Sequence, residues 1–179
     1  MAETVDSPRT ITVLDPAFVQ GIRDLPTDVV RRRRDESFAE REFQSYLRRL
    51  VQVRQDILVA ERSRREAGRE PAPLVEQLTS ALAKKPRRTR SRGEAFRIAL
   101  TGADIEEAER QLEVLLPKFS LDDPPSLEDD ELAEALATLS KVERAVSSRR
   151  AKVNRVHDRL QEELKGRYRE NPEEIPRDV

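Results

Sequence analysis

Apolar residues recur at helical spacing in two long stretches of this chain, and neither stretch contains a proline. In the first stretch, residues 27–67, apolar positions alternate at intervals of four and three residues, which is the pattern of a coiled-coil seam. These positions are Tyr46, Leu50, Val53, Ile57 and Ala60, with Phe43, Leu47, Val51 and Leu58 widening the apolar surface beside them. The second stretch, residues 127–168, carries its seam at Leu132, Leu139, Val142, Val146, Val153, Val156, Leu160 and Leu164. Each stretch is therefore predicted to form one long helix.

Capping signals set the ends of these helices and predict a further short one. Asp15 followed by Pro16 is a typical helix start, and it predicts a short helix over residues 16–24. Gly68 is a natural stop for the first long helix, and Ser126 is expected to cap the second.

The connecting segment, residues 69–125, is expected to contain short helices of its own. One is predicted by three leucines at i,i+4 spacing, Leu74, Leu78 and Leu82. A second is predicted over residues 104–116, because Asp104 and Glu107 have the spacing of a capping box ahead of an amphipathic run.

Two long helices of similar length, joined by a compact connection, are expected to fold back on each other. The predicted fold is therefore all-α: an antiparallel long-helix hairpin, or coiled coil, with additional short helices at the N-terminus and in the connection. Residues 15–171 then form a single helical unit. Residues 1–14 are expected to be a flexible tail, and residues 172–179 a second tail.

Composition agrees with a narrow core and places the protein in a broad class. Only 36% of the 179 residues are hydrophobic and 39% are charged, which favours a coiled coil over a thick globular core. A net charge of −1 gives no general reason to expect nucleic-acid binding. The chain has no cysteine, its start does not resemble a signal peptide, and no apolar run approaches the roughly 20 residues of a membrane span. We expect a soluble, cytoplasmic protein.

The sequence contains no arrangement of residues that suggests catalysis. The only histidine, His157, adjoins the seam and is interpreted as a residue on its flank. The five glycines are not grouped into a phosphate-binding loop, and acidic pairs such as Asp129-Asp130 belong to a helix start. We therefore expect neither an enzyme nor a metal site.

Each long helix carries a set of polar residues at spacings of three and four, and we call these sets ladders. The first ladder consists of Ser45, Arg48, Gln52 and Asp56. The second ladder consists of Glu143, Ser147, Arg150, Asn154 and Asp158. At roughly 100° per residue these spacings keep each set on one side of its helix.

The chemistry of the ladders suits a guanine nucleotide. An aspartate can accept two parallel hydrogen bonds from guanine N1–H and N2–H, and arginine can donate to O6 and N7 or pair with phosphate. Serine and glutamine can add neutral hydrogen bonds to phosphate. The alternative interpretation is a pair of solvated helix faces with ordinary i,i+4 contacts.

Several stretches resemble the RsiG anti-sigma factors, also called aerial mycelium formation proteins. Residues 45–58, which carry the first ladder, resemble the family's first signature helix. Residues 13–18, Leu25-Pro26, residues 125–132 and the second ladder are also similar to it. The resemblance covers most of the chain in order, leaving out the tails and the loop around residues 84–93.

The resemblance implies a helical protein that binds cyclic di-GMP and an alternative sigma factor of the sporulation and motility class. In such proteins each ladder reads E-x3-S-x2-R-x3-Q-x3-D, and the two ladders together bind a dimer of cyclic di-GMP. The nucleotide-bound protein holds the sigma factor inactive. Spare apolar surface at Phe18, Ile22 and Phe43 is expected to supply the sigma contact.

Two positions depart from the family pattern. Arg41 stands where the first ladder has Glu, and Asn154 stands where the second has Gln. Asparagine keeps the amide but is one methylene shorter, whereas arginine reverses the charge and cannot accept a hydrogen bond from guanine. These two changes indicate either a nucleotide site with altered binding properties or a protein that has partly lost its dependence on the nucleotide.

Three other functions stay open at this point. The chain can be a structural coiled-coil adaptor without nucleotide binding, or it can sequester a sigma factor independently of nucleotide. The third is weak nucleic-acid binding through residues 31–34 and the basic loop 84–92, although direct DNA binding is not expected. The run at residues 31–34 is most simply a solvated basic turn.

Overall fold

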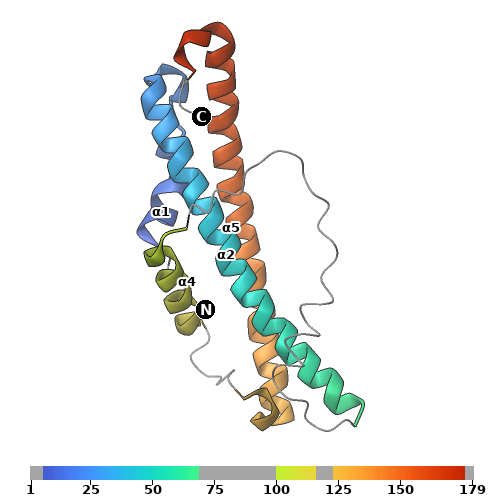
Figure 1. The fold of residues 1–179 in the computed structure, drawn as a ribbon. Coiled ribbons are helices and arrows are strands. Elements are labelled where there is room, and N and C mark those ends of the chain that lie inside the picture. Colours follow the sequence, from blue (N-terminus) through green and yellow to red (C-terminus); the bar gives the residue numbers. More distant parts are fainter. Residues whose placement is uncertain (1–5, 69–99, 116–122, 176–179) are drawn as a thin grey trace.

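The computed structural model describes residues 6–68, 100–115 and 123–175, and the regular elements over these residues are all helical (Figure 1). In chain order they are α1 (Pro8–Leu14), the 3-10 turns η1 (Pro16–Phe18) and η2 (Ile22–Asp24), α2 (Thr27–Glu66), α4 (Gly102–Leu115), the turn η3 (Pro124–Ser126), α5 (Asp129–Glu170) and the turn η4 (Pro172–Glu174). The helix predicted around Leu78 and the basic loop at residues 84–92 lie outside the described residues. Across the described ranges, no helix combines the length and the apolar character that a membrane span requires.

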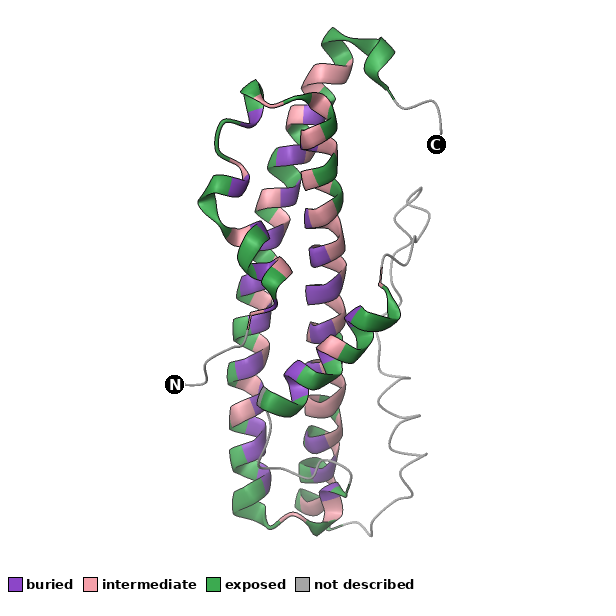
Figure 2. Ribbon diagram, turned by 90° about the vertical axis from the view of Figure 1, so that its left-hand side faces the viewer, coloured by how far each residue is buried: buried purple, intermediate pink, exposed green. Residues whose placement is uncertain are grey.

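The two long helices, α2 and α5, run antiparallel, and their buried residues face each other (Figure 2). This confirms the predicted all-α hairpin. Contacts at both ends of the pair show the direction: Arg31 hydrogen-bonds Tyr168, and Arg65 pairs with Asp129. Burying an aliphatic side chain contributes about 1.5–3 kcal/mol relative to leaving it exposed, so the long interface dominates the stability of the fold.

The buried stripe of α2 is not the predicted seam. Phe43, Leu47, Val51 and Leu58 are at most 1% exposed, whereas the predicted seam residues Tyr46, Leu50, Val53, Ile57 and Ala60 are only half-buried. The register differs because α2 packs against α4 as well as α5, so the deepest positions lie between these two neighbours. On α5 the prediction is correct except at Val156, which is half-buried, while the adjacent His157 is buried.

The N-terminal segment is a packed helix rather than a flexible tail over residues 8–14. Ser7 caps α1 by accepting a hydrogen bond from the Thr10 N–H at 3.1 Å, and Pro8 takes the first helical position. Val13 is fully buried in a cluster with residues of α2 and α5. Ser7-Pro8 is the same type of helix start signal as Asp15-Pro16, so the sequence contained a signal for a helix beginning at residue 8.

Three further predictions of local structure need correction. Residues 16–24 form two 3-10 turns instead of one helix, because Gly21 between them adopts a left-handed conformation with φ of 62°. The capping box of α4 uses Thr101 and Asp104, which exchange backbone-to-side-chain hydrogen bonds of 2.9 and 3.2 Å, rather than Asp104 and Glu107.

The start of α5 differs in a similar way. Ser126 does not cap this helix, because it lies in the preceding turn η3 and its hydroxyl donates to the Asp123 carbonyl at 2.7 Å. Glu128 is the N-cap instead, and its backbone N–H donates to the Glu131 carboxylate at 2.9 Å.

A buried carboxylate joins the short helices to the hairpin. Glu40 of α2 is fully buried, and it pairs with Arg9 of α1 at 2.9 Å. Its other oxygen accepts hydrogen bonds from Thr10 at 2.6 Å and Gln44 at 2.8 Å. Arg9 also pairs with Asp104 of α4 at 2.6 Å. One connected group of charges therefore fixes α1 and α4 on the same side of α2.

Arginines hold the open end of the hairpin together, which corrects the interpretation of residues 31–34 as a solvated basic turn. Arg31 bonds the Tyr168 hydroxyl and the Glu174 carbonyl, and Arg33 bonds the Phe18 carbonyl. Arg167 of α5 donates to the carbonyls of Ile22 and Leu25, both at 2.6 Å.

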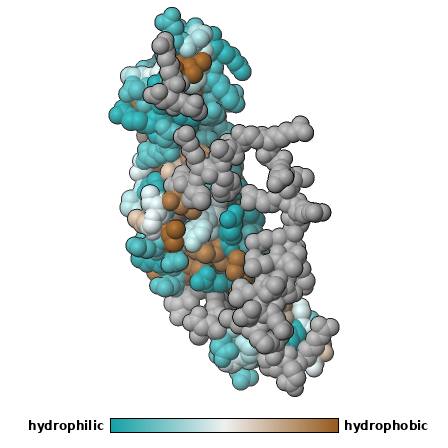
Figure 3. All heavy atoms as spheres, viewed as in Figure 1, coloured by the Kyte–Doolittle hydropathy of each residue, from teal (hydrophilic) through white to brown (hydrophobic). Residues whose placement is uncertain are grey.

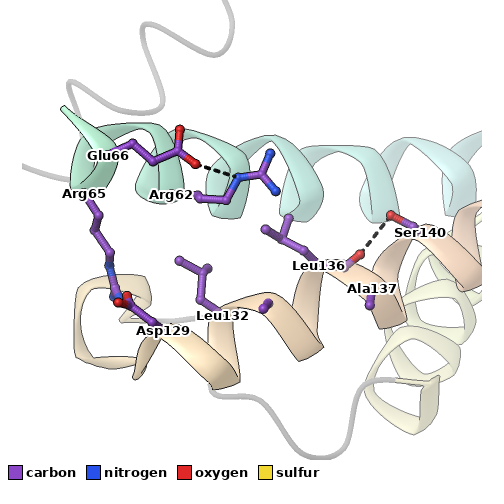
Figure 4. A pocket seen from close by; sticks show the side chains of 9 residues that line it. Arg62, Arg65, Glu66, Asp129, Leu132, Leu136, Ala137 and Ser140 are labelled. Atoms are coloured by element: carbon purple, nitrogen blue, oxygen red, sulfur yellow. Dashed lines mark hydrogen bonds and ion pairs between the residues drawn. The ribbon is translucent and has the colours of Figure 1, made fainter.

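An arginine also holds the other end of the hairpin together. Arg65 of α2 pairs with Asp129 at 2.6 Å and donates to the Leu127 carbonyl at 2.7 Å (Figure 4). Glu61 orients the Arg65 side chain by accepting a hydrogen bond from it at 2.7 Å. The hydrogen bond from Arg64, and to a lesser extent the one from Arg65, lower the pKa of Glu61 to about 2. The Glu61 carboxylate is therefore ionised at neutral pH, which preserves both ion pairs.

Candidate functional site

The two ladders lie opposite each other along one edge of the interface between α2 and α5. The antiparallel register brings Ser45 beside Arg150 and Arg48 beside Ser147. Arg48 Nε donates to the Ser147 hydroxyl at 2.7 Å, and Arg150 Nε donates to the Ser45 hydroxyl at 2.9 Å. Each arginine thus reaches the serine of the other ladder, and the centre of the site has an approximate two-fold symmetry.

Charge breaks this symmetry. On one side, Glu143 accepts hydrogen bonds from Arg48 at 3.0 Å and from Ser147 at 2.8 Å, so the Arg48 guanidinium is neutralised. The equivalent position on α2 is Arg41. Its guanidinium instead lies 4.6 Å from the centre of the Phe38 ring and pairs with Glu42 at 3.3 Å. Arg150 has no carboxylate partner among the described residues, so this half of the site is the more positive one.

Among the described residues, no hydrogen bond or ion pair joins the remaining ladder residues to one another. Gln52 and Asn154 are half-buried, and the Asn154 side-chain oxygen is buried with no hydrogen-bond partner in the described part of the chain. Asp56 and Asp158 are exposed and lie toward opposite ends of the hairpin, since each is the last member of its ladder. Both carboxylates are therefore open to solvent.

His157 adjoins the seam, as expected, but it is buried, and it lies near Arg41 in the more positive half of the site. It is 8% exposed, its Nδ1 is 3.2 Å from the Ser37 hydroxyl, and its ring centre is 5.8 Å from that of Phe38. Burial lowers its pKa, and the positive charge of Arg41 lowers it further. Ser37 and Phe38 were not identified from the sequence, because neither belongs to a ladder or to the predicted seam.

The charge of Arg41 can be measured through this histidine. Arg41→Glu should raise the pKa of His157, because a carboxylate favours the protonated imidazole where the guanidinium opposes it. His157 is the only histidine, so one proton NMR signal followed against pH reports the change. Arg49→Glu makes the same charge change at an exposed position of α2 and should leave the pKa of His157 unchanged. Equal titrations for wild type and Arg41→Glu would place Arg41 away from the histidine.

The site does not have the composition of a metal centre. Among residues 6–68, 100–115 and 123–175, no group of three or more His, Asp or Glu side chains is arranged to hold a metal ion. The chemistry that the site offers is hydrogen bonding from two guanidiniums at its centre and acceptance by two carboxylates at its ends.

The surface expected to supply the sigma contact is not available. Phe18, Ile22 and Phe43 are 7%, 5% and 1% exposed, because they belong to the two hydrophobic clusters that hold the short elements on the hairpin. In the space-filling view, the part of this face that is not covered by grey atoms is mostly polar, with small apolar patches near the middle and one near the top (Figure 3).

Comparison with known proteins supports the interpretation for the first half of the molecule. No curated protein matches the chain. The family model that matches covers η1, η2, α2 and the first ladder, while the second ladder lies beyond it. Over residues 16–82 the sequence matches the family described as RsiG-like, and the family resemblance predicted from the sequence is confirmed there.

Proposed function

We propose that this protein is an anti-sigma factor that binds an alternative sigma factor of the sporulation and motility class and holds it inactive. The RsiG-like match over residues 16–82 carries the proposal, because it includes the helix with the first ladder. The second support is independent of that match: α5 presents Arg150 and Ser147 opposite Ser45 and Arg48, as a two-ladder site requires.

Cyclic di-GMP is the ligand that best fits the two ladders. Arg48 and Arg150 meet at the centre of the site, where guanidiniums can pair with phosphate or donate to guanine O6 and N7. Asp56 and Asp158 are exposed, and neither has an ion pair among the described residues, so each is available to accept from guanine N1–H and N2–H. A ligand with phosphates at its centre and guanines at its ends matches this order.

The nucleotide would regulate the protein through binding linkage. Bound cyclic di-GMP favours the sigma complex only as far as it binds that complex more tightly than the free protein. Since the ladders join α2 to α5, a ligand bridging them stabilises one relative position of the two helices.

A second candidate is sigma-factor sequestration without nucleotide. The asymmetry of the site favours it: Glu143 already occupies Arg48, and Arg41 replaces a carboxylate that could accept from guanine. In this case the polar edge serves mainly to hold the two helices together.

Transcription assays with purified components test the proposal. We expect the protein to inhibit RNA polymerase carrying a sporulation or motility sigma factor of its host, with stronger inhibition when cyclic di-GMP is added. Inhibition that is equal with and without the nucleotide selects the second candidate. Failure to inhibit any such sigma factor, with or without nucleotide, would contradict the anti-sigma assignment and favour a structural adaptor.

A further inference from the structure

A basic groove lies between the N-terminal segment and α5, away from the ladders. Its apolar lining, which we call the floor, consists of Leu14, Val19 and Val156, and its volume is about 430 Å³. Lys152, Arg155 and Arg159 line it as well, and all three are exposed. No acidic residue is part of its lining. We call this feature the basic groove.

The positive charge of the groove is not neutralised within the described part of the molecule. Residues 144–157 contain five Lys or Arg and no Asp or Glu, in a chain whose net charge is only −1. Two of these arginines have partners, since Arg149 pairs with Asp6 at 2.7 Å and Arg150 bonds Ser45. The cations of the groove have no ion pair among the described residues.

The nearest acidic residue along the helix is Asp158, which is exposed and has no ion pair among the described residues, whereas the next two are already engaged. Glu162 pairs with Lys165 at 2.7 Å, and Glu163 pairs with Arg167 at 2.9 Å. Three exposed cations beside one exposed carboxylate, Asp158, leave the groove with an excess of positive charge, and its chemistry calls for an acidic partner.

The floor of the groove calls for an apolar partner surface as well. Leu14, Val19 and Val156 pack on the second hydrophobic cluster but stay half-buried. Ile11 lies one turn before Leu14 in α1, and its side chain is 61% exposed. Aliphatic side chains framed by cations fit a helix that is apolar on one face and acidic at its edges. Phosphate backbones gain nothing from such a floor, which favours a protein over a nucleic acid.

We propose that the basic groove docks an acidic amphipathic helix of the sigma factor that this protein sequesters; the identity of the partner rests on the proposed function. At roughly 100° per residue, positions 152, 155 and 159 lie on the side of α5 roughly opposite positions 147, 150 and 154 of the ladder. The sigma factor and the nucleotide therefore bind different sides of the same helix, and both can be bound at once.

Charge reversal in the groove tests this proposal. Arg155→Glu/Arg159→Glu should weaken the binding of purified sigma factor, measured by fluorescence anisotropy with saturating cyclic di-GMP, roughly tenfold or more. Arg49→Glu/Arg169→Glu makes the same change in net charge at exposed positions outside the groove and should change affinity by less than about threefold. If the groove variant and the wild type bind sigma factor with equal affinity, the groove is not the docking site, although the anti-sigma function can still hold.

A variant without any charge change tests the apolar part. Val156→Ser keeps every charge, and it should weaken sigma binding at 0.5 M salt as well as at low salt, since apolar contacts are not screened. Circular dichroism confirms that each variant stays helical. If the groove variants instead lose affinity for a 20-base-pair duplex DNA and bind sigma factor normally, the groove is a nucleic-acid site and the proposal is wrong. If the wild type binds no sigma factor at all, the proposed function and this inference both fail.

Discussion

Replacing Glu40 with alanine should lower the free energy of unfolding by about 3 kcal/mol. Glu40 is fully buried, and its carboxylate holds Arg9 and Thr10 of α1 as well as Gln44 of its own helix. Without it, the partly buried Arg9 keeps only its ion pair with Asp104, and the buried Thr10 and Gln44 side chains each lose one hydrogen-bond acceptor. Urea denaturation followed by circular dichroism measures the change.

The matched control is Glu134→Ala on the exposed side of α5, which should change the free energy of unfolding by less than about 0.5 kcal/mol. The loss in free energy of unfolding for Glu40→Gln should lie between those of the two alanine variants, because glutamine keeps the shape of the side chain and loses its charge. Faster hydrogen exchange in α1 and α4 should accompany the loss in Glu40→Ala. Similar free energies of unfolding for the two alanine variants would show that the buried pair is not a structural tie.

Asp56→Ala and Asp158→Ala should each weaken cyclic di-GMP binding about ten- to a hundredfold, if the ladders bind the nucleotide as proposed. A carboxylate that accepts two hydrogen bonds from a guanine edge contributes about 1–3 kcal/mol of discrimination. Both residues are exposed and lie off the buried stripe, so helicity should stay unchanged. Isothermal titration of wild type and variants, with and without sigma factor, measures the effect.

Asp28→Ala serves as the control for this pair, because Asp28 is an exposed aspartate of α2 that contacts only Arg32 among the described residues. Nucleotide binding that is equal in Asp28→Ala, Asp56→Ala and Asp158→Ala would remove the carboxylates from the site. Absence of binding by the wild type at high micromolar nucleotide, even with sigma factor present, would instead favour nucleotide-independent sequestration.

The long helices could be predicted from the sequence because their signals are local. Repeats of three and four residues, the absence of proline and the breaks at Gly68 and Pro124-Pro125 give α2 and α5 to within two residues at each end. Which stripe of α2 is buried deepest could not be predicted in the same way. It depends on α4 packing beside α5, and that contact joins segments far apart in the chain.

The ladders could be recognised from the spacing of their residues, but the difference in charge between the two halves of the site could not. The family resemblance indicates a glutamate where this sequence has Arg41. Only the fold shows that Glu143 neutralises Arg48 and that Arg150 has no carboxylate partner among the described residues. Similarly, the buried position of His157 follows from its neighbours Ser37 and Phe38 on the other helix. Contacts across an interface depend on its register, which a single sequence does not specify.

At the two ends of the hairpin, arginines bind main-chain carbonyls in addition to side chains. Arg167 holds Ile22 and Leu25 in this way, and Arg65 holds Leu127. Every residue type carries the same carbonyl, so the turns at both ends can change their side chains without losing these contacts. Substitutions of the turn side chains should therefore preserve the helix pairing, whereas substitutions of these arginines should weaken it.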